Sequence, residues 1–97
     1  MYTATMEYEF KENSFDAGCK LWKEDILDLA KKQPGFVRMQ YLTAKPKAMA
    51  IGNWKKQEDA QNFMQTGVFK HLLTQLEGLI VSKPKPKIWE LRYFEEK

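Results

Sequence analysis

The sequence predicts an α+β fold in which two helices cover one face of a four-stranded antiparallel sheet. The hydrophobic period switches along the chain between two, which is typical of strands, and about 3.6, which is typical of helices. The predicted order is strand, helix, strand, strand, helix, strand, and 97 residues suit a single domain over 1–97. With right-handed connections, this order gives a ferredoxin-like β-α-β-β-α-β layout.

The first half of the chain contains a strand and a long helix. Residues 1–10 alternate between apolar and polar side chains, which predicts a strand. From Phe15 to Leu29 apolar residues recur at steps of four and three, which predicts an amphipathic helix. Asn13 or Ser14 is expected to cap this helix. Trp22 lies on the apolar stripe and is therefore predicted to be a core residue.

The second half is predicted to form a hairpin, two short helices and a last strand. Gly52 within a strand indicates a bulge or the close approach of another group, and Thr66 is a candidate cap between the helices. The tract "SKPKPK" cannot be helical and is expected to be extended. In chain order, the expected elements are strand 35–43, strand 48–54, helix 55–64, helix 68–80 and strand 87–96.

Composition excludes several classes of function. The net charge is +3 with scattered lysines, so we expect no nucleic-acid partner. No apolar run approaches the roughly 20 residues of a membrane span, and the first ten residues lack the features of a secretion signal, so a cytoplasmic protein without membrane contact is expected. Cys19 is the only cysteine and is expected to be a buried apolar thiol that binds no metal.

The strands carry large apolar residues on both faces, whereas two helices cover only one face of a sheet. We therefore expect a homodimer built through the bare sheet face around a twofold axis. The last strand is expected to extend this contact toward the partner. The residues that we expect not to fit together on the helix side are Tyr2, Met6, Tyr8, Val37, Met39, Tyr41, Trp89 and Tyr93, with Phe36, Leu42, Ile88 and Phe94.

Three segments resemble a known family. These are "LAKKQPGFVRMQYL", "AIGNWKKQEDAQNFMQTGVFKHLLTQL" and "KIWELRYF". Together they resemble the antibiotic-biosynthesis-monooxygenase-like domains of the dimeric α+β barrel superfamily. The resemblance implies two sheets stacked face to face, with an apolar space in each protomer between sheet and helices. Such domains include oxygenases, haem-degrading enzymes, isomerase-like proteins and members without known activity.

The resemblance does not extend to the haem-degrading branch. That branch carries an Asn on the first strand, a Trp in the short helix and a His ten residues later. Here the first strand has no Asn, and Phe63 and Leu73 occupy the other two positions. His71 lies about 200° around the helix from Leu73 and cannot replace the missing ligand. We expect no haem and no other cofactor.

Four residues are candidates for a site. His71 is either a proton acceptor at a pocket or a helix-surface residue. Some oxygenases of the family hold a phenolic substrate with an Asn and a Trp near Asn53 and Trp54, although these can equally be a turn residue and a packing residue. Phe63 is the further candidate pocket wall. Strand alternation places Asn53 on the face opposite Trp54.

Two function classes remain open. One is a cofactor-independent monooxygenase acting on an aromatic or quinol-like substrate, with His71 as base and Asn53 as oxyanion partner. The other is a non-catalytic dimeric barrel that binds a small ligand or serves as an interaction module. A strand tyrosine, Tyr8, Tyr41 or Tyr93, could donate a hydrogen bond to a ligand carbonyl or simply fill an interface. A cavity of about 300 Å³ or more facing His71 or Asn53 would favour the enzyme.

Overall fold

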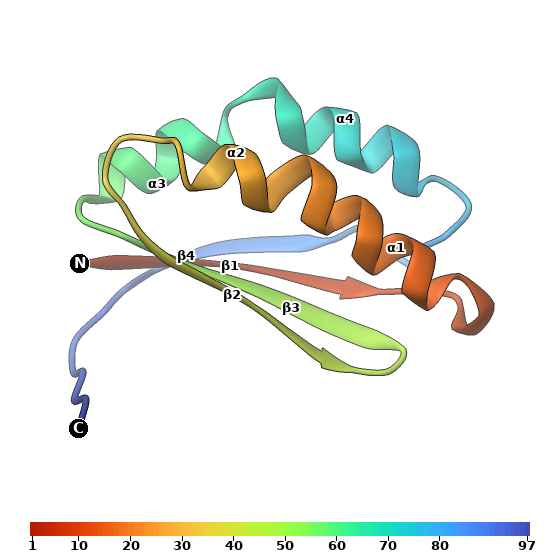
Figure 1. Ribbon diagram of the computed structural model, residues 1–97, viewed down its shortest axis with the longest axis horizontal. Coiled ribbons are helices and arrows are strands. Elements are labelled where there is room, and N and C mark those ends of the chain that lie inside the picture. The colour runs from red at the N-terminus through yellow and green to blue at the C-terminus, as the bar shows by residue number, and fades with distance from the viewer.

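The computed structural model describes residues 1–97 as a four-stranded antiparallel sheet with all helices on one face (Figure 1). The spatial order of the strands is β2-β3-β1-β4, so the first strand of the chain is central. This order confirms the predicted ferredoxin-like β-α-β-β-α-β fold. The strands are β1 (Tyr2–Glu9), β2 (Phe36–Ala44), β3 (Lys47–Trp54) and β4 (Lys85–Glu90).

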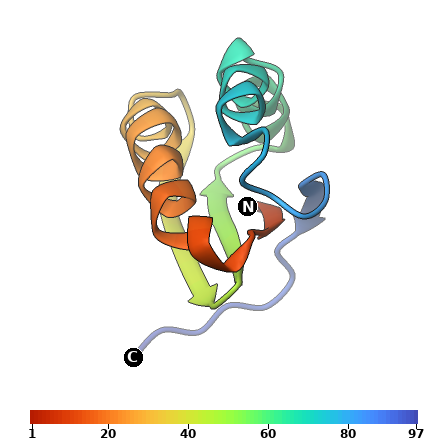
Figure 2. The ribbon, with the colours of Figure 1, turned by 90° about the vertical axis from the view of Figure 1, so that its right-hand side faces the viewer.

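The helices form two columns that run side by side above the sheet (Figure 2). In the first column a π-helical segment interrupts an otherwise α-helical run, a feature that the apolar spacing did not predict. No helix is long and apolar enough to span a membrane. The elements are η1 (Glu12–Ser14), α1 (Phe15–Trp22), the π-helical η2 (Lys23–Leu27) and α2 (Asp28–Ala30) in one column, and α3 (Gln57–Met64) and α4 (Gly67–Leu76) in the other.

The second column ends earlier than the sequence predicted. The helical pattern extended to residue 80, but α4 ends at Leu76. Gly78 then adopts a φ of 84°, in the left-handed region that favours glycine, and turns the chain away from the helix. Ile80 forms an isolated bridge to Phe10 instead of a last helical turn. The apolar residues after Leu76 therefore continue the packing without continuing the helix.

The core lies between the helices and the covered face of the sheet. β3 supplies a floor of small residues, Ala48, Ala50 and Gly52, which is closed at one end by Trp54. α1 packs closely against the Phe10 ring at Gly18, where a Cβ would overlap that ring. The buried hydrophobic residues are Tyr8, Phe10, Phe15, Trp22, Ile26, Ala30, Ala48, Ala50, Trp54, Ala60, Phe63, Leu72 and Leu76.

As expected, the large strand residues do not all lie on the helix side, since Leu42 and Trp89 lie on the other face and are 50% and 46% exposed. Tyr8 is in the core, and Met6, Met39, Tyr41, Phe36 and Ile88 pack against it. The small floor residues of β3 leave room for these side chains. In addition, the register of β2 against β3 shifts between Phe36 and Arg38, so Val37 is an extra residue and both Phe36 and Met39 reach the helix side.

The helix-free face of the sheet is mixed rather than aromatic. Trp89 is 46% exposed there, its indole donates a hydrogen bond to Thr5 Oγ1 at 2.9 Å, and the Lys87 ammonium lies 4.0 Å from its ring centroid. By strand register, this face carries Thr3, Thr5, Glu7, Arg38, Gln40, Leu42, Met49, Ile51, Asn53, Lys85, Lys87 and Trp89.

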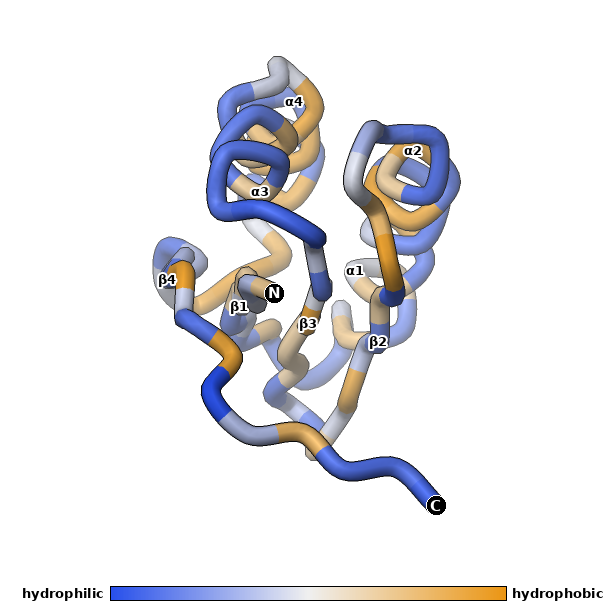
Figure 3. The backbone as a smooth tube through the Cα atoms, turned by 90° about the vertical axis from the view of Figure 1, so that its left-hand side faces the viewer, coloured by the Kyte–Doolittle hydropathy of each residue, from blue (hydrophilic) through white to orange (hydrophobic).

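The last strand ends at Glu90 rather than at residue 96. Its partner β1 begins at Tyr2, which pairs with Glu90, and only one further bond forms, from the Leu91 N–H to the Met1 carbonyl at 3.0 Å. Beyond that point no strand remains to pair with. The tail, residues 91–97, crosses beneath the helix-free face toward β2 (Figures 2 and 3). There Arg38 Nη2 lies 3.7 Å from Glu96 Oε2.

Candidate functional site

A small apolar cavity lies between the covered sheet face and the helices. Its volume is about 30 Å³, close to the space of a single water molecule. Small residues of β1 and β3 form its floor, and aromatic residues from β3 and from both helix columns form its walls. The lining residues are Ala4, Thr5, Met6, Trp22, Ile26, Met39, Ala50, Gly52, Trp54, Phe63, Met64 and Phe69.

Trp54 and Phe63, the two predicted pocket walls, lie together at this cavity. Trp54 is the last residue of β3 and is 1% exposed. Its ring centroid lies 5.2 Å from that of Phe63, and the Phe63 centroid lies 5.2 Å from that of Phe69. One strand, β3, and two helices, α3 and α4, thus contribute to one aromatic wall. Whether these rings hold a ligand stays a prediction.

Gly52 keeps the floor of the cavity low. A Cβ at this position would lie 3.0 Å from Met39 Cε and 3.1 Å from Trp54 Nε1, closer than side-chain carbons normally approach. The close approach that the sequence indicated at Gly52 is therefore made by two cavity-lining side chains. A methyl group here would push directly into the walls.

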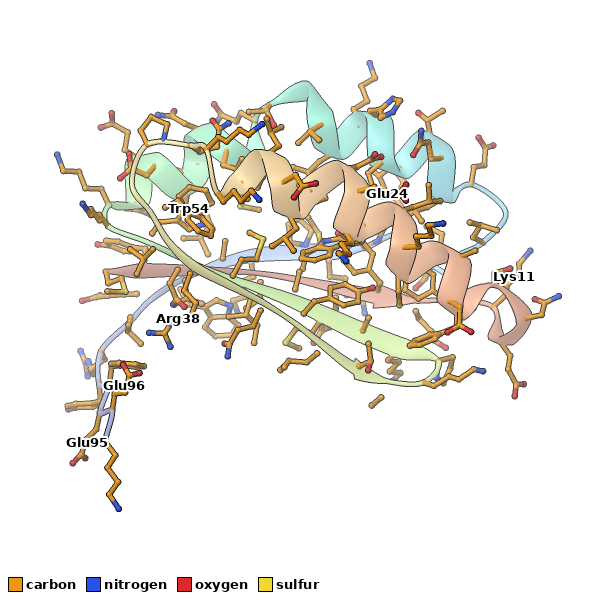
Figure 4. The ribbon with its side chains drawn as sticks, viewed as in Figure 1. Lys11, Glu24, Arg38, Trp54, Glu95 and Glu96 are labelled. Atoms are coloured by element: carbon orange, nitrogen blue, oxygen red, sulfur yellow. The ribbon has the colours of Figure 1, made fainter.

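Asn53 lies on the other side of the sheet. Its amide donates a hydrogen bond to Thr3 Oγ1 at 2.8 Å, on the helix-free face. Arg38, its partner in the register with β2, points to the same side, and Figure 4 shows the Arg38 and Trp54 side chains on opposite sides of the sheet. Asn53 therefore does not line the cavity, in keeping with the alternation expected from the sequence.

His71 is on the outer part of α4 and does not line the cavity either. Its side chain is 62% exposed. Its Nε2 atom lies 3.0 Å from Gln75 Nε2 and 4.0 Å from Asp25 Oδ2 on η2. The structure therefore unites Trp54 and Phe63 but leaves His71 and Asn53 apart from them and from each other. A catalytic role for either stays a prediction.

The structure contains a polar layer beneath α1 that the sequence did not predict. The Tyr41 hydroxyl donates a hydrogen bond to Cys19 Sγ at 3.3 Å, and the Tyr41 ring stacks on Trp22 with centroids 4.3 Å apart. Cys19 is thus half-buried and hydrogen-bonded, not the purely apolar buried thiol that was expected. Alternation along the strands identified Tyr8 and Tyr41, but it could not show that α1 places Trp22 and Cys19 against them.

Burial controls the protonation of these tyrosines. It raises the pKa of Tyr8 well above the ordinary range, and the Trp22 indole beside the hydroxyl opposes this to a smaller extent. Burial, and next the bond to Cys19, raise the pKa of Tyr41 in the same direction. Both phenols are therefore neutral hydrogen-bond donors at physiological pH.

A larger hollow of about 350 Å³ lies on the helix-free face, near the β2–β3 hairpin. It is bordered mainly by charged and small side chains, and neither His71 nor Asn53 reaches it. No three His, Cys, Asp or Glu side chains are grouped as a metal site would require. The residues around the hollow are Glu7, Tyr8, Glu9, Leu42, Thr43, Ala44, Lys47, Ala48, Met49, Ser82, Lys83 and Lys85.

Comparison with known proteins identifies the fold. No family model matches the sequence, and no curated protein matches it. Solved structures do match. SnoaB, a cofactor-independent oxygenase from Streptomyces nogalater solved as a variant, is 16% identical, with a TM-score of 0.81 over 99% of this chain and 97% of that one. The chain has the antibiotic biosynthesis monooxygenase-like fold.

Two further structures support this assignment. A protein from Nitrosomonas europaea, provisionally named an antibiotic biosynthesis monooxygenase, is 16% identical, with a TM-score of 0.81 over 96% of this chain and all of that one. A monooxygenase from the ActVA-Orf6 gene of Streptomyces coelicolor, in complex with nanaomycin D, is 15% identical, with a TM-score of 0.79 over 99% of this chain and 91% of that one. At such identities the likeness establishes the fold and leaves the activity to be argued from the site.

Proposed function

We propose that the protein is a small-molecule enzyme that oxidises an aromatic or quinol-like substrate without a resident cofactor. The observation that carries the proposal is the aromatic-walled cavity above a floor of alanine and glycine, because this lining matches the chemistry of a flat apolar ring. Two proteins of the same fold support it by their names, since one is a cofactor-independent oxygenase and another is a monooxygenase in complex with nanaomycin D.

Substrate entry requires the cavity to widen. A volume of about 30 Å³ does not hold an aromatic ring. Three of the lining residues, Met6, Met39 and Met64, are methionines, whose unbranched side chains adapt to an incoming ligand more readily than branched ones. Trp54 and Phe63 then flank the ring and exclude water. In such a dry site a deprotonated substrate can itself pass an electron to oxygen.

Gly52→Ala tests this use of the cavity. The added methyl group meets Met39 and Trp54 and occupies space that the substrate needs. We expect oxygen uptake with a responsive quinol to fall about tenfold or more, because misplacement of a bound substrate has effects of this size. Gly67→Ala is the control, since a Cβ there meets nothing within 4 Å. Equal uptake by both variants, or none by the wild type with any quinol, would refute the proposal.

One observation favours the second candidate, a binding module without catalysis. The cavity is far below the 300 Å³ or more of ordinary small-molecule sites, and the two candidate polar residues, His71 and Asn53, do not line it. Saturable binding of an aromatic compound without oxygen uptake or product would support the module over the enzyme. His71→Ala belongs in the same assay, because loss of uptake without loss of binding would assign His71 its predicted role as base.

We also propose that the chain forms a homodimeric α+β barrel through its helix-free face. Leu42, Met49, Ile51 and Trp89 give this face an apolar centre, and in the adjoining tail Tyr93 is 85% and Phe94 58% exposed. Face-to-face packing of two sheets about 10 Å apart removes this surface from water. The exposed tail aromatics can extend the contact toward the partner.

Sedimentation equilibrium at micromolar concentration tests the dimer. We expect twice the 11.5 kDa chain mass for the wild type. Ile51→Lys, in the centre of the face, should yield a folded monomer, because an unpaired charge is costly in a buried interface. Gln61→Lys on the exposed side of α3 is the matched control and should remain dimeric. A folded, soluble wild-type monomer would contradict the barrel.

A further inference from the structure

The two helix columns meet at a polar contact between η2 and α4. Asp25 is the middle residue of the π-helical η2, and its Oδ2 atom lies 4.0 Å from His71 Nε2 on α4. Asp25 is the more buried partner, since its side chain is 19% exposed against 62% for His71. π-Helical segments are rare and are frequently found at functional sites. The contact therefore calls for an explanation beyond packing.

The Asp25 carboxylate lacks a hydrogen bond that its burial requires. Its Oδ2 atom is buried and has no partner, although buried polar atoms in proteins are nearly always paired. His71 does not supply the bond in the observed arrangement. Its Nε2 atom lies 3.0 Å from Gln75 Nε2, an amide nitrogen that can only donate, so the imidazole nitrogen accepts and carries no proton. The observed contact thus belongs to neutral His71.

A proton on His71 would exchange one contact for the other. Histidine changes its charge between about pH 5 and pH 8. Once protonated, His71 Nε2 can no longer accept from Gln75, and the acceptor that faces its new N–H is Asp25 Oδ2. A small rotation of the side chains would close the 4.0 Å separation into a charge-assisted hydrogen bond. A bond within α4 is thereby replaced by a bond between the columns.

No other charged group of the neighbouring helices forms an ion pair with His71 or Asp25. Cys19, the other titratable group of α1, is bonded to Tyr41 on the sheet side of the helix. The remaining charged residues of α1, η2, α2 and α4 are exposed, and those that form ion pairs do so along their own column. They are Asp16, Lys20, Lys23, Glu24, Asp28 and Lys70.

The contact connects the two helical walls of the cavity. Ile26, which follows Asp25, lines the cavity from the first column, and Phe69, two positions before His71, lines it from the second. The columns run side by side above the sheet (Figure 2). A bond that holds them together therefore opposes the widening that an aromatic ring requires. A ligand that needs the wider state binds more weakly when the closed state is stabilised.

We propose that Asp25 and His71 form a pH-dependent gate, in which a proton on His71 links the helix columns and hinders the entry of an aromatic ring into the cavity. This inference rests on the proposed function and concerns the regulation of its site. The gate acts through the distance between the columns and needs no contact between His71 and the substrate. It favours binding at neutral and mildly alkaline pH.

The first test measures the affinity for 1-naphthol, a phenol that stays neutral in this range, at about pH 5.5 and about pH 8. Calorimetric titration without oxygen reports binding alone. We expect the wild type to bind about threefold more weakly at the lower pH, since a partly exposed ion pair has a modest effect. Asp25→Asn should bind equally at both. Asp28→Asn is the matched control, because it removes the same charge from an exposed pair with Lys31, and it should behave as the wild type.

Nitrogen NMR of the imidazole gives a second readout that needs no ligand. His71 is the only histidine, so its signals are unambiguous. At about pH 8 the proton should be on Nδ1, and at about pH 5.5 the Nε2–H should exchange with water more slowly in the wild type than in Asp25→Asn.

Three outcomes would overturn the gate while the proposed function stands. They are a proton on Nε2 at the higher pH, equal exchange in the two proteins, and wild-type binding of 1-naphthol with the same affinity at both pH values. If the wild type binds no 1-naphthol at either pH, the proposed function fails and the gate fails with it.

Discussion

The two faces of the sheet are built from the same strands but follow different rules. The covered face has alanine and glycine along β3, with large side chains from β1, β2 and the helices filling the space above them. The helix-free face alternates threonine, lysine, glutamate and arginine with a few apolar residues, and its one tryptophan, Trp89, is bonded to a threonine. Size complementarity organises the first face, and pairwise polar contacts organise the second.

This difference teaches where substitutions matter and why. On the covered face each side chain is confined by several others, so an added or removed methyl group affects its neighbours. On the helix-free face Trp89 keeps 46% of its surface exposed, so a substitution there disturbs few contacts within the chain. We therefore compare substitutions of the same residue type, tryptophan, glycine or tyrosine, at one confined and one exposed position.

Replacing a tryptophan should have the largest effect. Trp22→Ala is expected to lower the free energy of unfolding by about 3–5 kcal/mol, because it removes a fully buried ring and leaves a cavity. Trp89→Ala removes one exposed hydrogen bond and should cost about 1 kcal/mol. Urea titration at a concentration where the chain is monomeric compares the two. Similar shifts for both variants would contradict the contrast between the faces.

Adding one methyl group should have a smaller effect, with opposite signs at two glycines. In Gly18→Ala the new Cβ overlaps the buried Phe10 ring, and such overpacking typically costs about 1–3 kcal/mol. Gly67→Ala adds a methyl group in open space at the start of α4 and should stabilise the chain by up to about 1 kcal/mol. The difference in urea midpoint between the two variants is the measurement. A stabilised Gly18→Ala would show that Phe10 moves aside freely.

Alkaline pH should destabilise the folded chain through its buried tyrosines but not through an exposed one. In the folded chain the pKa of Tyr8 is raised above the unfolded value of about 10, so above pH 10 the unfolded chain releases this proton first. The contribution of Tyr8 to the free energy of unfolding is therefore fully present below pH 10 and decreases above it, by about 1.4 kcal/mol per pH unit. The contribution of Tyr41 changes in the same direction. Tyr8→Phe should reduce the slope of the urea midpoint against pH, whereas Tyr93→Phe should not. An unchanged slope in Tyr8→Phe would exclude this origin.

Much of the fold was predictable because each element has its own hydrophobic period. The strand order followed from that pattern and from the handedness of connections, and Trp22 on the stripe of α1 was correctly assigned to the core. The bulge at Val37 was not predictable. The alternation of side chains in β2 fits its pairing with β3 equally well with or without the extra residue, so only the observed pairing reveals the bulge. The end of β4 likewise depends on where β1 begins. The last residue of β4, Glu90, pairs with the first residue of β1, Tyr2, which lies 88 positions earlier in the sequence.

The candidate site was predictable only in its apolar part. Trp54 and Phe63 are separated by nine positions in consecutive elements, so local spacing brought them together. The polar part depends on contacts between distant elements, because Tyr8 comes from β1, Trp22 from α1 and Tyr41 from β2. His71 was singled out for its chemistry alone, and its place on the exposed side of α4 follows from the packing of Leu72 and Leu76 into the core.

The central position of β1 has a consequence for how the chain is made. β1 is synthesised before the other three strands of the sheet, yet its neighbours β3 and β4 end only at Trp54 and Glu90. It therefore leaves the ribosome with both edges unpaired, and the second edge is closed only after β4 has been synthesised. Unpaired apolar strands invite association with other chains, and distant pairings form slowly. Nascent chains that stop before residue 85 should thus be the ones that need a chaperone, while the finished chain closes its own sheet.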